Sequence, residues 1–133
     1  MKASGNANRM QDERPKVLLV DDDDVNLMLV SAALQQHGFD ITEANNGDEA
    51  LRLLGGWIPD LVVLDARMPG LDGFETCRRL KANPALAHLP VIFMTGLAIA
   101  AVRDALAPAP VLFKPFSRKH LLTAVARAAG RAR

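Results

Sequence analysis

The stretch that decides the fold is KVLLVDDDDVN, residues 16–26. In it, a short aliphatic run leads directly into four consecutive aspartates. Two carboxylates about 4 Å apart repel each other by roughly 1 kcal/mol in water and by about 4 kcal/mol at the dielectric of a protein surface. We therefore expect a positive partner close to this segment, supplied by another part of the chain.

The composition indicates one domain with an aliphatic core. The chain has 133 residues, of which 50% are hydrophobic and 5% aromatic, and this length suits a single domain. A net charge of +1 argues neither for nor against a polyanionic partner. Cys77 is the single cysteine, so an intrachain disulfide is excluded, which fits a reducing cytosol. We expect a cytoplasmic location.

The two ends of the chain predict its organisation. Residues 1–15, MKASGNANRMQDERP, are polar and lack the apolar centre of a signal peptide. No apolar run approaches the roughly 20 residues that a membrane span needs. We expect a flexible arm over 1–14, one folded domain over 15–130 and a short tail over 131–133. The chain has no helix-turn-helix pattern after its basic C-terminal region, so we expect no direct nucleic-acid binding. Because no apolar run is long enough to span a membrane, we also expect no membrane contact.

Short aliphatic runs alternate with helical patterns along the chain. The runs 16–20, 61–65, 91–95 and 111–113 are typical of strands buried on both faces, and 39–44 is a weaker fifth strand. Helical patterns fill the intervals, and they cover 24–37, 47–54, 73–82, 97–106 and 117–129. Five alternations of strand and helix predict an α/β fold, with a parallel sheet covered by helices on both faces.

Polar residues stand where the predicted strands end. Asp21 and Asp22 follow the first strand, Asp65 and Thr95 end the third and fourth, and Lys114 follows the fifth. Sheets of this kind bind ligands outside the carboxyl ends of their strands. An acidic group with only oxygen donors suits a hard divalent cation, above all Mg²⁺. The sequence thus predicts a magnesium site at this edge, with the Lys114 ammonium as a second positive partner.

The remaining aspartates of the run have a simpler interpretation. Asp23 and Asp24 stand at the entry to the first helix, where acids favour the positive end of the helix dipole and can cap free N–H groups. The run could also begin a calcium loop at Asp22. That loop would need glycine at its sixth position and glutamate at its twelfth, where this chain has Leu27 and Ala33. We therefore set the calcium loop aside.

With these residues in place, the chain resembles the receiver domain of two-component response regulators. The matching segments are VLLVDDDD (17–24), PDLVVLDARMPGLDGFE (59–75), LPVIFMTG (89–96) and FKPF (113–116), in the order of that family. With the alternation of strands and helices, the resemblance covers about residues 16–129. It implies a single doubly wound, flavodoxin-like domain with five parallel strands in the order 2-1-3-4-5.

The resemblance also implies a phosphoryl acceptor and a metal site. In the family, the aspartate that ends the third strand accepts a phosphoryl group from a phosphohistidine, and the matching residue is Asp65. By the same match, Mg²⁺ would be bound by Asp22, by Asp65 and by the backbone carbonyl of Arg67. Asp21 would act on the metal through water.

Two further residues match groups that contact the phosphoryl group in the family. Thr95 would hydrogen-bond the phosphoryl oxygens, and Lys114 would pair with their charge. The bond between Lys114 and Pro115 is usually cis in the family, which is a rare arrangement elsewhere. Family members catalyse their own phosphorylation and dephosphorylation, so the chain is expected to be a regulator and not an enzyme acting on other substrates.

The resemblance implies the kinds of partner as well. A sensor histidine kinase or a phosphotransfer protein would donate the phosphoryl group. A downstream protein, or an output domain outside this chain, would read the phosphorylated state. A homodimer is a further possibility that family members realise.

The chain departs from the family pattern in two places. Val111 stands three residues before the lysine, where the family usually has a Tyr or Phe whose rotamer reports phosphorylation. The segment between Thr95 and Lys114 is a few residues short and contains APAP at 107–110, which predicts a shortened or altered fourth-helix region. These departures motivate an alternative function, a receiver-fold interaction module that works without phosphorylation. An aspartate-based phosphohydrolase is disfavoured, because Arg67 stands where such enzymes carry a second aspartate.

Overall fold

The computed structural model describes residues 14–68, 70–96, 111–114 and 116–132, and its centre is a five-stranded parallel sheet. The strands lie in the order β2-β1-β3-β4-β5, which confirms the predicted topology. Their bounds are β1 (Lys16–Val20), β2 (Asp40–Ala44), β3 (Leu61–Asp65), β4 (Val91–Thr95) and β5 (Val111–Phe113).

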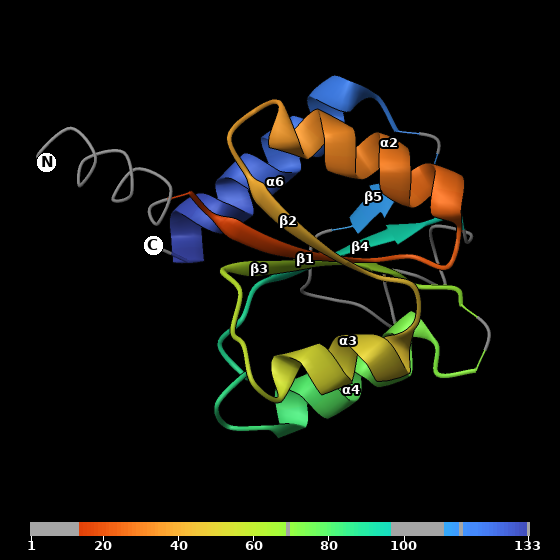
Figure 1. Cartoon of the computed structure of the whole chain (residues 1–133), viewed down its shortest axis with the longest axis vertical. Helices are drawn as coiled ribbons and strands as arrows, with labels where there is room; N and C mark the ends of the chain where they lie inside the picture. Colours follow the sequence, from red (N-terminus) through yellow and green to blue (C-terminus); the bar gives the residue numbers. More distant parts are fainter. Residues whose placement is uncertain (1–13, 69, 97–110, 115, 133) are drawn as a thin grey trace, which may run out of the picture.

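Helices cover both faces of the sheet (Figure 1). Helices α2 (Asp24–Gln35) and α6 (Arg118–Ala132) pack on one face, whereas α3 (Gly47–Leu54) and α4 (Gly73–Ala82) pack on the other. Within the described residues, no helix combines the length and the apolar character that crossing a membrane requires.

The core is divided into two layers by the sheet. Successive side chains of a strand point to opposite faces, so each buried strand contributes to both layers. In β1, Val17 and Leu19 face α2 and α6, while Leu18 and Val20 face α3 and α4. Strands β3 and β4 have no exposed position, as expected for the centre of a doubly covered parallel sheet. The result is an aliphatic core that holds the strand ends in fixed positions.

The predicted elements agree with the structure except at some ends. The first helix ends at Gln35 and not at 37, and Gly38 follows it with a φ of 88°, a backbone conformation that glycine adopts at low cost. Strand β2 begins at Asp40, one residue later than predicted, and α6 continues through Ala132, three residues beyond the predicted end. The predicted helix at 97–106 and the altered fourth-helix region lie outside the described residues.

The parallel register brings the carboxyl ends of the strands to one edge of the sheet. Asp65 in β3 is paired with Met94 in β4, and Thr95 is paired with Phe113 in β5. The N–H of Asp21 donates to the carbonyl of Ala44 at 3.2 Å, which fixes the exit of β1 beside β2. The polar residues that follow these strands therefore share a common edge.

Candidate functional site

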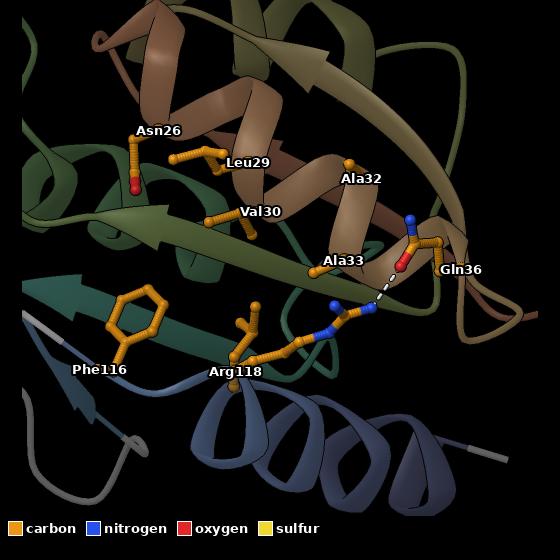
Figure 2. A pocket seen from close by; sticks show the side chains of 9 residues that line it. Asn26, Leu29, Val30, Ala32, Ala33, Gln36, Phe116 and Arg118 are labelled. Carbon is orange, nitrogen blue, oxygen red and sulfur yellow. Dashed lines mark hydrogen bonds between the residues drawn. The ribbon is translucent and has the colours of Figure 1, made fainter.

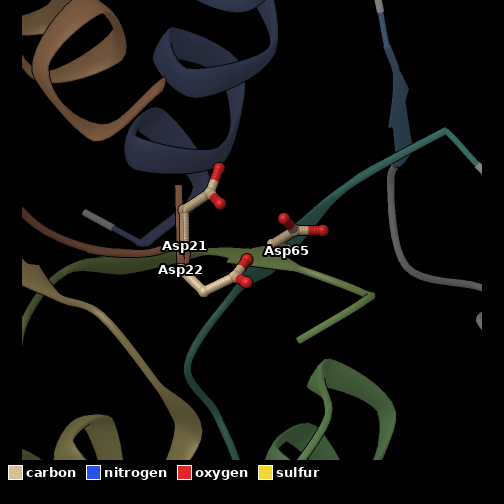
Figure 3. Close-up of side chains that lie close together, drawn as sticks. All are labelled: Asp21, Asp22 and Asp65. Carbon is tan, nitrogen blue, oxygen red and sulfur yellow. The ribbon is translucent and has the colours of Figure 1, made fainter. Parts of the chain in front are cut away.

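Three carboxylates meet at this edge (Figure 3). Asp21 and Asp22 follow β1, Asp65 ends β3, and one ligand oxygen from each residue lies within 4.8 Å of the other two. Asp21 is 0% exposed and Asp65 is 5% exposed, whereas Asp22 is exposed to solvent. The site thus has a buried side, formed by Asp21 and Asp65, and an open side at Asp22.

The buried carboxylate of Asp21 is surrounded by donors. Its Oδ1 accepts the backbone N–H of Asp23 at 3.0 Å, and its Oδ2 accepts the side-chain amide of Asn26. The ammonium of Lys114 lies 3.5 Å from the same Oδ2. Burial of an ionised carboxylate without such partners is very unfavourable, so these three contacts make the buried position possible.

Asp65 is held from two directions. Its Oδ1 accepts the backbone N–H of Arg67 at 3.1 Å, and its Oδ2 accepts a hydrogen bond from Lys114 at 3.1 Å. Burial raises the pKa of Asp65 to about 6; the Arg67 N–H opposes this rise, as Lys114 does, while neighbouring Asp21 adds to it. The carboxyl group is therefore mostly ionised at pH 7 even in the absence of metal.

Lys114 is the positive partner that the sequence predicts close to the run of aspartates. Its Nζ bridges Asp65 and Asp21 from the end of β5. Burial by itself lowers the pKa of Lys114, but the hydrogen bond and charge of Asp65, together with the charge of Asp21, outweigh burial and place that pKa above its usual value. The ammonium group remains charged across the physiological range.

Asp23 and Asp24 have the helix-entry positions that the sequence predicts. Asp23 is the N-cap of α2, and its Oδ1 accepts the backbone N–H groups of Val25 at 3.0 Å and Asn26 at 3.3 Å. Asp24 lies in the first turn, where its charge favours the helix dipole. Two of the four aspartates therefore start the helix, and the other two belong to the acidic cluster.

The remaining predicted residues lie at the same edge. Thr95 is fully buried at the end of β4, and its carbonyl accepts the backbone N–H of Lys114 at 2.7 Å. Arg67 has an exposed side chain, and its backbone N–H rather than its carbonyl makes the hydrogen bond to Asp65. The metal contact of the Arg67 carbonyl stays a prediction, and so does the cis bond before Pro115, because Pro115 lies outside the described residues.

The donor set fits a hard divalent cation. All three side chains offer carboxylate oxygens, and one of them, Asp22, opens to solvent, where a metal that keeps several waters can be accommodated. Nitrogen and sulfur ligands, which would favour zinc or copper, are absent from the acidic cluster defined by Asp21, Asp22 and Asp65. The three carboxylates therefore offer the oxygen ligands that Mg²⁺ prefers.

Asn26 belongs to this site, although the sequence pattern does not predict it as a site residue. The available signal was its place in the helix: Asp23 is the N-cap, so Asn26 is the third helical residue, whose side chain can reach back past the cap. Asn26 also lines a groove of about 370 Å³ between α2 and α6, which Arg118 and Gln36 bridge with a hydrogen bond (Figure 2).

Comparison with known proteins places these features in a family. The family model of the response regulator receiver domain matches residues 17–126. Response regulator PleD of Caulobacter vibrioides is 39% identical over 82 residues, which are 62% of this chain and 18% of PleD. The phosphate regulon transcriptional regulatory protein PhoB of Rhizobium meliloti is 36% identical over 114 residues, which are 84% of this chain and 50% of PhoB. The chain thus spans half or less of these two relatives.

A solved structure of a receiver domain is similar to this chain over most of its length. The receiver domain of the sensor histidine kinase PA1611 from Pseudomonas aeruginosa PAO1 is 30% identical, with a TM-score of 0.80 that covers 88% of this chain and 98% of that one. That protein has a magnesium ion coordinated in its active site cleft. The family match spans most of the chain and includes every residue of the acidic cluster, so the chain belongs to the response regulator receiver domain family of two-component systems.

Proposed function

We propose that the chain is a phosphoryl-accepting switch, in which Asp65 takes a phosphoryl group from a phosphohistidine donor. The observation that carries this proposal is the acidic cluster with Lys114 hydrogen-bonded to its central carboxylate at 3.1 Å. It combines a nucleophilic oxygen, a cation site and a fixed positive charge at one edge of the sheet.

In the proposed phosphoryl transfer, Asp65 is the nucleophile. A carboxylate oxygen of Asp65 attacks phosphorus, the bond between phosphorus and the donor imidazole nitrogen breaks, and the imidazole leaves with the electron pair. With a pKa of about 6, Asp65 is mostly ionised at pH 7, so no general base is needed. Oδ2 is the oxygen beside Lys114, so a phosphoryl group added there has the ammonium next to its own oxygens.

The other site residues have supporting roles in this proposal. Asp22, Asp65 and the backbone carbonyl of Arg67 would hold Mg²⁺, and Asp21 would support it through water. When bound, Mg²⁺ neutralises charge on the phosphoryl oxygens, which is the main demand of a loose phosphoryl-transfer transition state. The Thr95 hydroxyl and the Lys114 ammonium contact the same oxygens. Return of the acyl phosphate to the carboxylate by hydrolysis makes the chain a timed switch that acts on itself.

The proposal includes the partners and the location. The donor is a sensor histidine kinase or a phosphotransfer protein, and the reader of the switch is a downstream protein or an output domain of a longer chain. Output regions of this kind fit the curated relatives, because the matched part is 50% of PhoB and 18% of PleD. A cytoplasmic location agrees with the single, half-buried cysteine.

The test is phosphate incorporation from acetyl phosphate, measured by intact mass. The unsubstituted chain is expected to gain one phosphate only when Mg²⁺ is present, and Asp65→Asn is expected to gain none. Asp60→Asn is the matched control, because Asp60 lies at the other end of β3, where its Oδ2 accepts the backbone N–H of Lys16 at 2.7 Å. Full incorporation by Asp65→Asn would overturn the assignment of the acceptor.

A second candidate function rests on Val111. This residue is half-buried at the start of β5 and packs against the core on the α3 and α4 side. Because its side chain is aliphatic, this position has no aromatic ring whose rotamer could change. The alternative is an interaction module of receiver fold whose binding surface is constant. An amide NMR spectrum recorded before and after phosphorylation separates the two functions: shifts restricted to residues beside Asp65 favour the constant module, and shifts that reach β5 and α6 favour the switch.

A further inference from the structure

Asn26 is the one side-chain amide that contacts the acidic cluster among the described residues. Its Nδ2 donates to Oδ2 of Asp21, the fully buried carboxylate of the cluster. The backbone N–H of Asn26 donates in turn to the Asp23 N-cap at 3.3 Å. The amide is therefore held in place by the first turn of α2 before any ligand arrives.

Two donors share the same oxygen of Asp21. The Asn26 amide and the Lys114 ammonium both approach Oδ2, Lys114 at 3.5 Å. Lys114 lies closer to Oδ2 of Asp65, at 3.1 Å. The neutral amide supplies the hydrogen bond that the buried Asp21 carboxylate needs, so the ammonium is left with its shorter contact to Asp65.

We infer that Asn26 is a positioning residue that keeps Lys114 directed at Asp65 by satisfying Asp21 with a neutral donor. The inference rests on the proposed function, in which Lys114 must face the group on Asp65. In the absence of the amide, Oδ2 of Asp21 would be short of a donor in a buried position, and the nearest cation is Lys114. The ammonium would then move toward Asp21, pairing with one carboxylate of the metal site and leaving the acceptor.

This arrangement has a measurable effect on Mg²⁺ affinity. Lys114 competes with Mg²⁺ for the negative charge of the acidic cluster. A move of its ammonium from Asp65, a proposed direct ligand, to Asp21, which is proposed to act through water, therefore redistributes the charge that Mg²⁺ meets. Partners that orient a metal-binding carboxylate typically change metal affinity by about tenfold or more when they are removed. Asn26→Ala is therefore expected to change the Mg²⁺ dissociation constant about tenfold, and the change should depend on the presence of Lys114.

The test is a double-mutant cycle on the Mg²⁺ dissociation constant, measured by calorimetry on the full chain. Four proteins are compared: unsubstituted, Asn26→Ala, Lys114→Ala and the double variant. If Asn26 acts by holding Lys114 away from Asp21, Asn26→Ala should change the dissociation constant about tenfold in the first background and less than about threefold when Lys114 is already alanine. Val25→Ala is the matched control, because Val25 is the preceding residue of α2 and is 59% exposed; its effect should stay within about twofold.

The outcomes separate this inference from the proposed function. Equal changes in both backgrounds would overturn the inference, since they would mean that Asn26 supports the helix or Asp21 without regard to Lys114. No change in either background would overturn it as well. Failure of Asp65 to take up phosphate, with the Lys114-dependent change of Mg²⁺ affinity intact, would contradict the proposed function and leave the role of Asn26 standing. Circular dichroism of each variant checks that all four proteins are folded.

Discussion

The four aspartates of residues 21–24 have four different environments. Asp21 is buried and surrounded by donors, Asp22 is exposed at the open side of the acidic cluster, Asp23 caps α2, and Asp24 lies in its first turn. The repulsion within the run is reduced by the positive end of the helix and by Lys114. Sequence adjacency therefore does not make the four carboxylates equivalent, and substitutions of them should affect different properties.

Asp65 should make the metal-free protein less stable at neutral pH than at acid pH. Its pKa is about 6 in the folded chain and 3.8 as the ordinary value, so the folded state binds more protons than the unfolded state between these values. Stability is therefore lost as the pH rises through this window, and the penalty, about 3 kcal/mol, is nearly complete by about pH 7. Asp65→Asn removes the ionisation and should be more stable than the unsubstituted chain at pH 8.

Urea unfolding in EDTA at several pH values measures this difference. The gap in unfolding free energy between Asp65→Asn and the unsubstituted chain should grow from pH 4 to pH 7 and then stay constant. Other titrating groups are common to both proteins and cancel in the comparison. A gap that is independent of pH would show that the buried carboxyl is not the source of the effect.

At the scale of the elements, α4 begins directly against the backbone that carries Asp65. Gly73 is the first residue of α4, and a Cβ at this position would overlap the carbonyl oxygen of Asp65 and lie 2.7 Å from Cα of Ala66. The N–H of Gly73 donates to the carbonyl of Ala66 at 3.1 Å. The start of this helix and the end of β3 therefore form one closely packed unit.

Gly73→Ala should destabilise the fold and disturb the site together. The neighbouring atoms belong to the backbone, so they cannot move aside as a side chain would, and we expect a loss of about 2 kcal/mol or more in unfolding free energy. Gly130→Ala is the matched control: Gly130 is exposed in α6, a Cβ there meets nothing within 4 Å, and alanine should stabilise the helix by up to about 1 kcal/mol. Denaturant unfolding compares both. A Gly73→Ala protein as stable as the parent would show that the packing at this position is looser than described.

The strands could be predicted more closely than the helix ends. The predicted bounds of β1, β3, β4 and β5 agree with the structure because each strand is an aliphatic run that a charged or polar residue or a proline ends. The sequence predicts the end of α2 two residues too late, because Gln36 and His37 are compatible with both a helix and a turn. The contact of Asn26 with Asp21 depends on how the chain turns between β1 and α2, which residue type alone does not specify.

At the scale of the whole molecule, Mg²⁺ should stabilise the fold by mass action. A ligand that binds only the folded state at 100 times its dissociation constant adds about 2.7 kcal/mol to the unfolding free energy. Asp22→Asn should abolish most of this gain, and it should change the stability of the metal-free chain by no more than about 0.5 kcal/mol, because Asp22 is exposed. Fluorescence of the single tryptophan, Trp57, which is half-buried against the core, reports the unfolding. An equal Mg²⁺ gain in Asp22→Asn would remove Asp22 from the metal ligands.

The direction of the chain through the sheet has a consequence for modular assembly. The described part of the chain begins with Arg14, before the amino end of β1. Helix α6 runs against the strand direction, so both ends of the described part emerge at the edge opposite the acidic cluster (Figure 1). A linker, a fluorescent tag or a neighbouring domain joined at either end would start far from Asp65. Other domains can thus be joined to this fold at either end, and a docking protein would still reach the edge that carries Asp65.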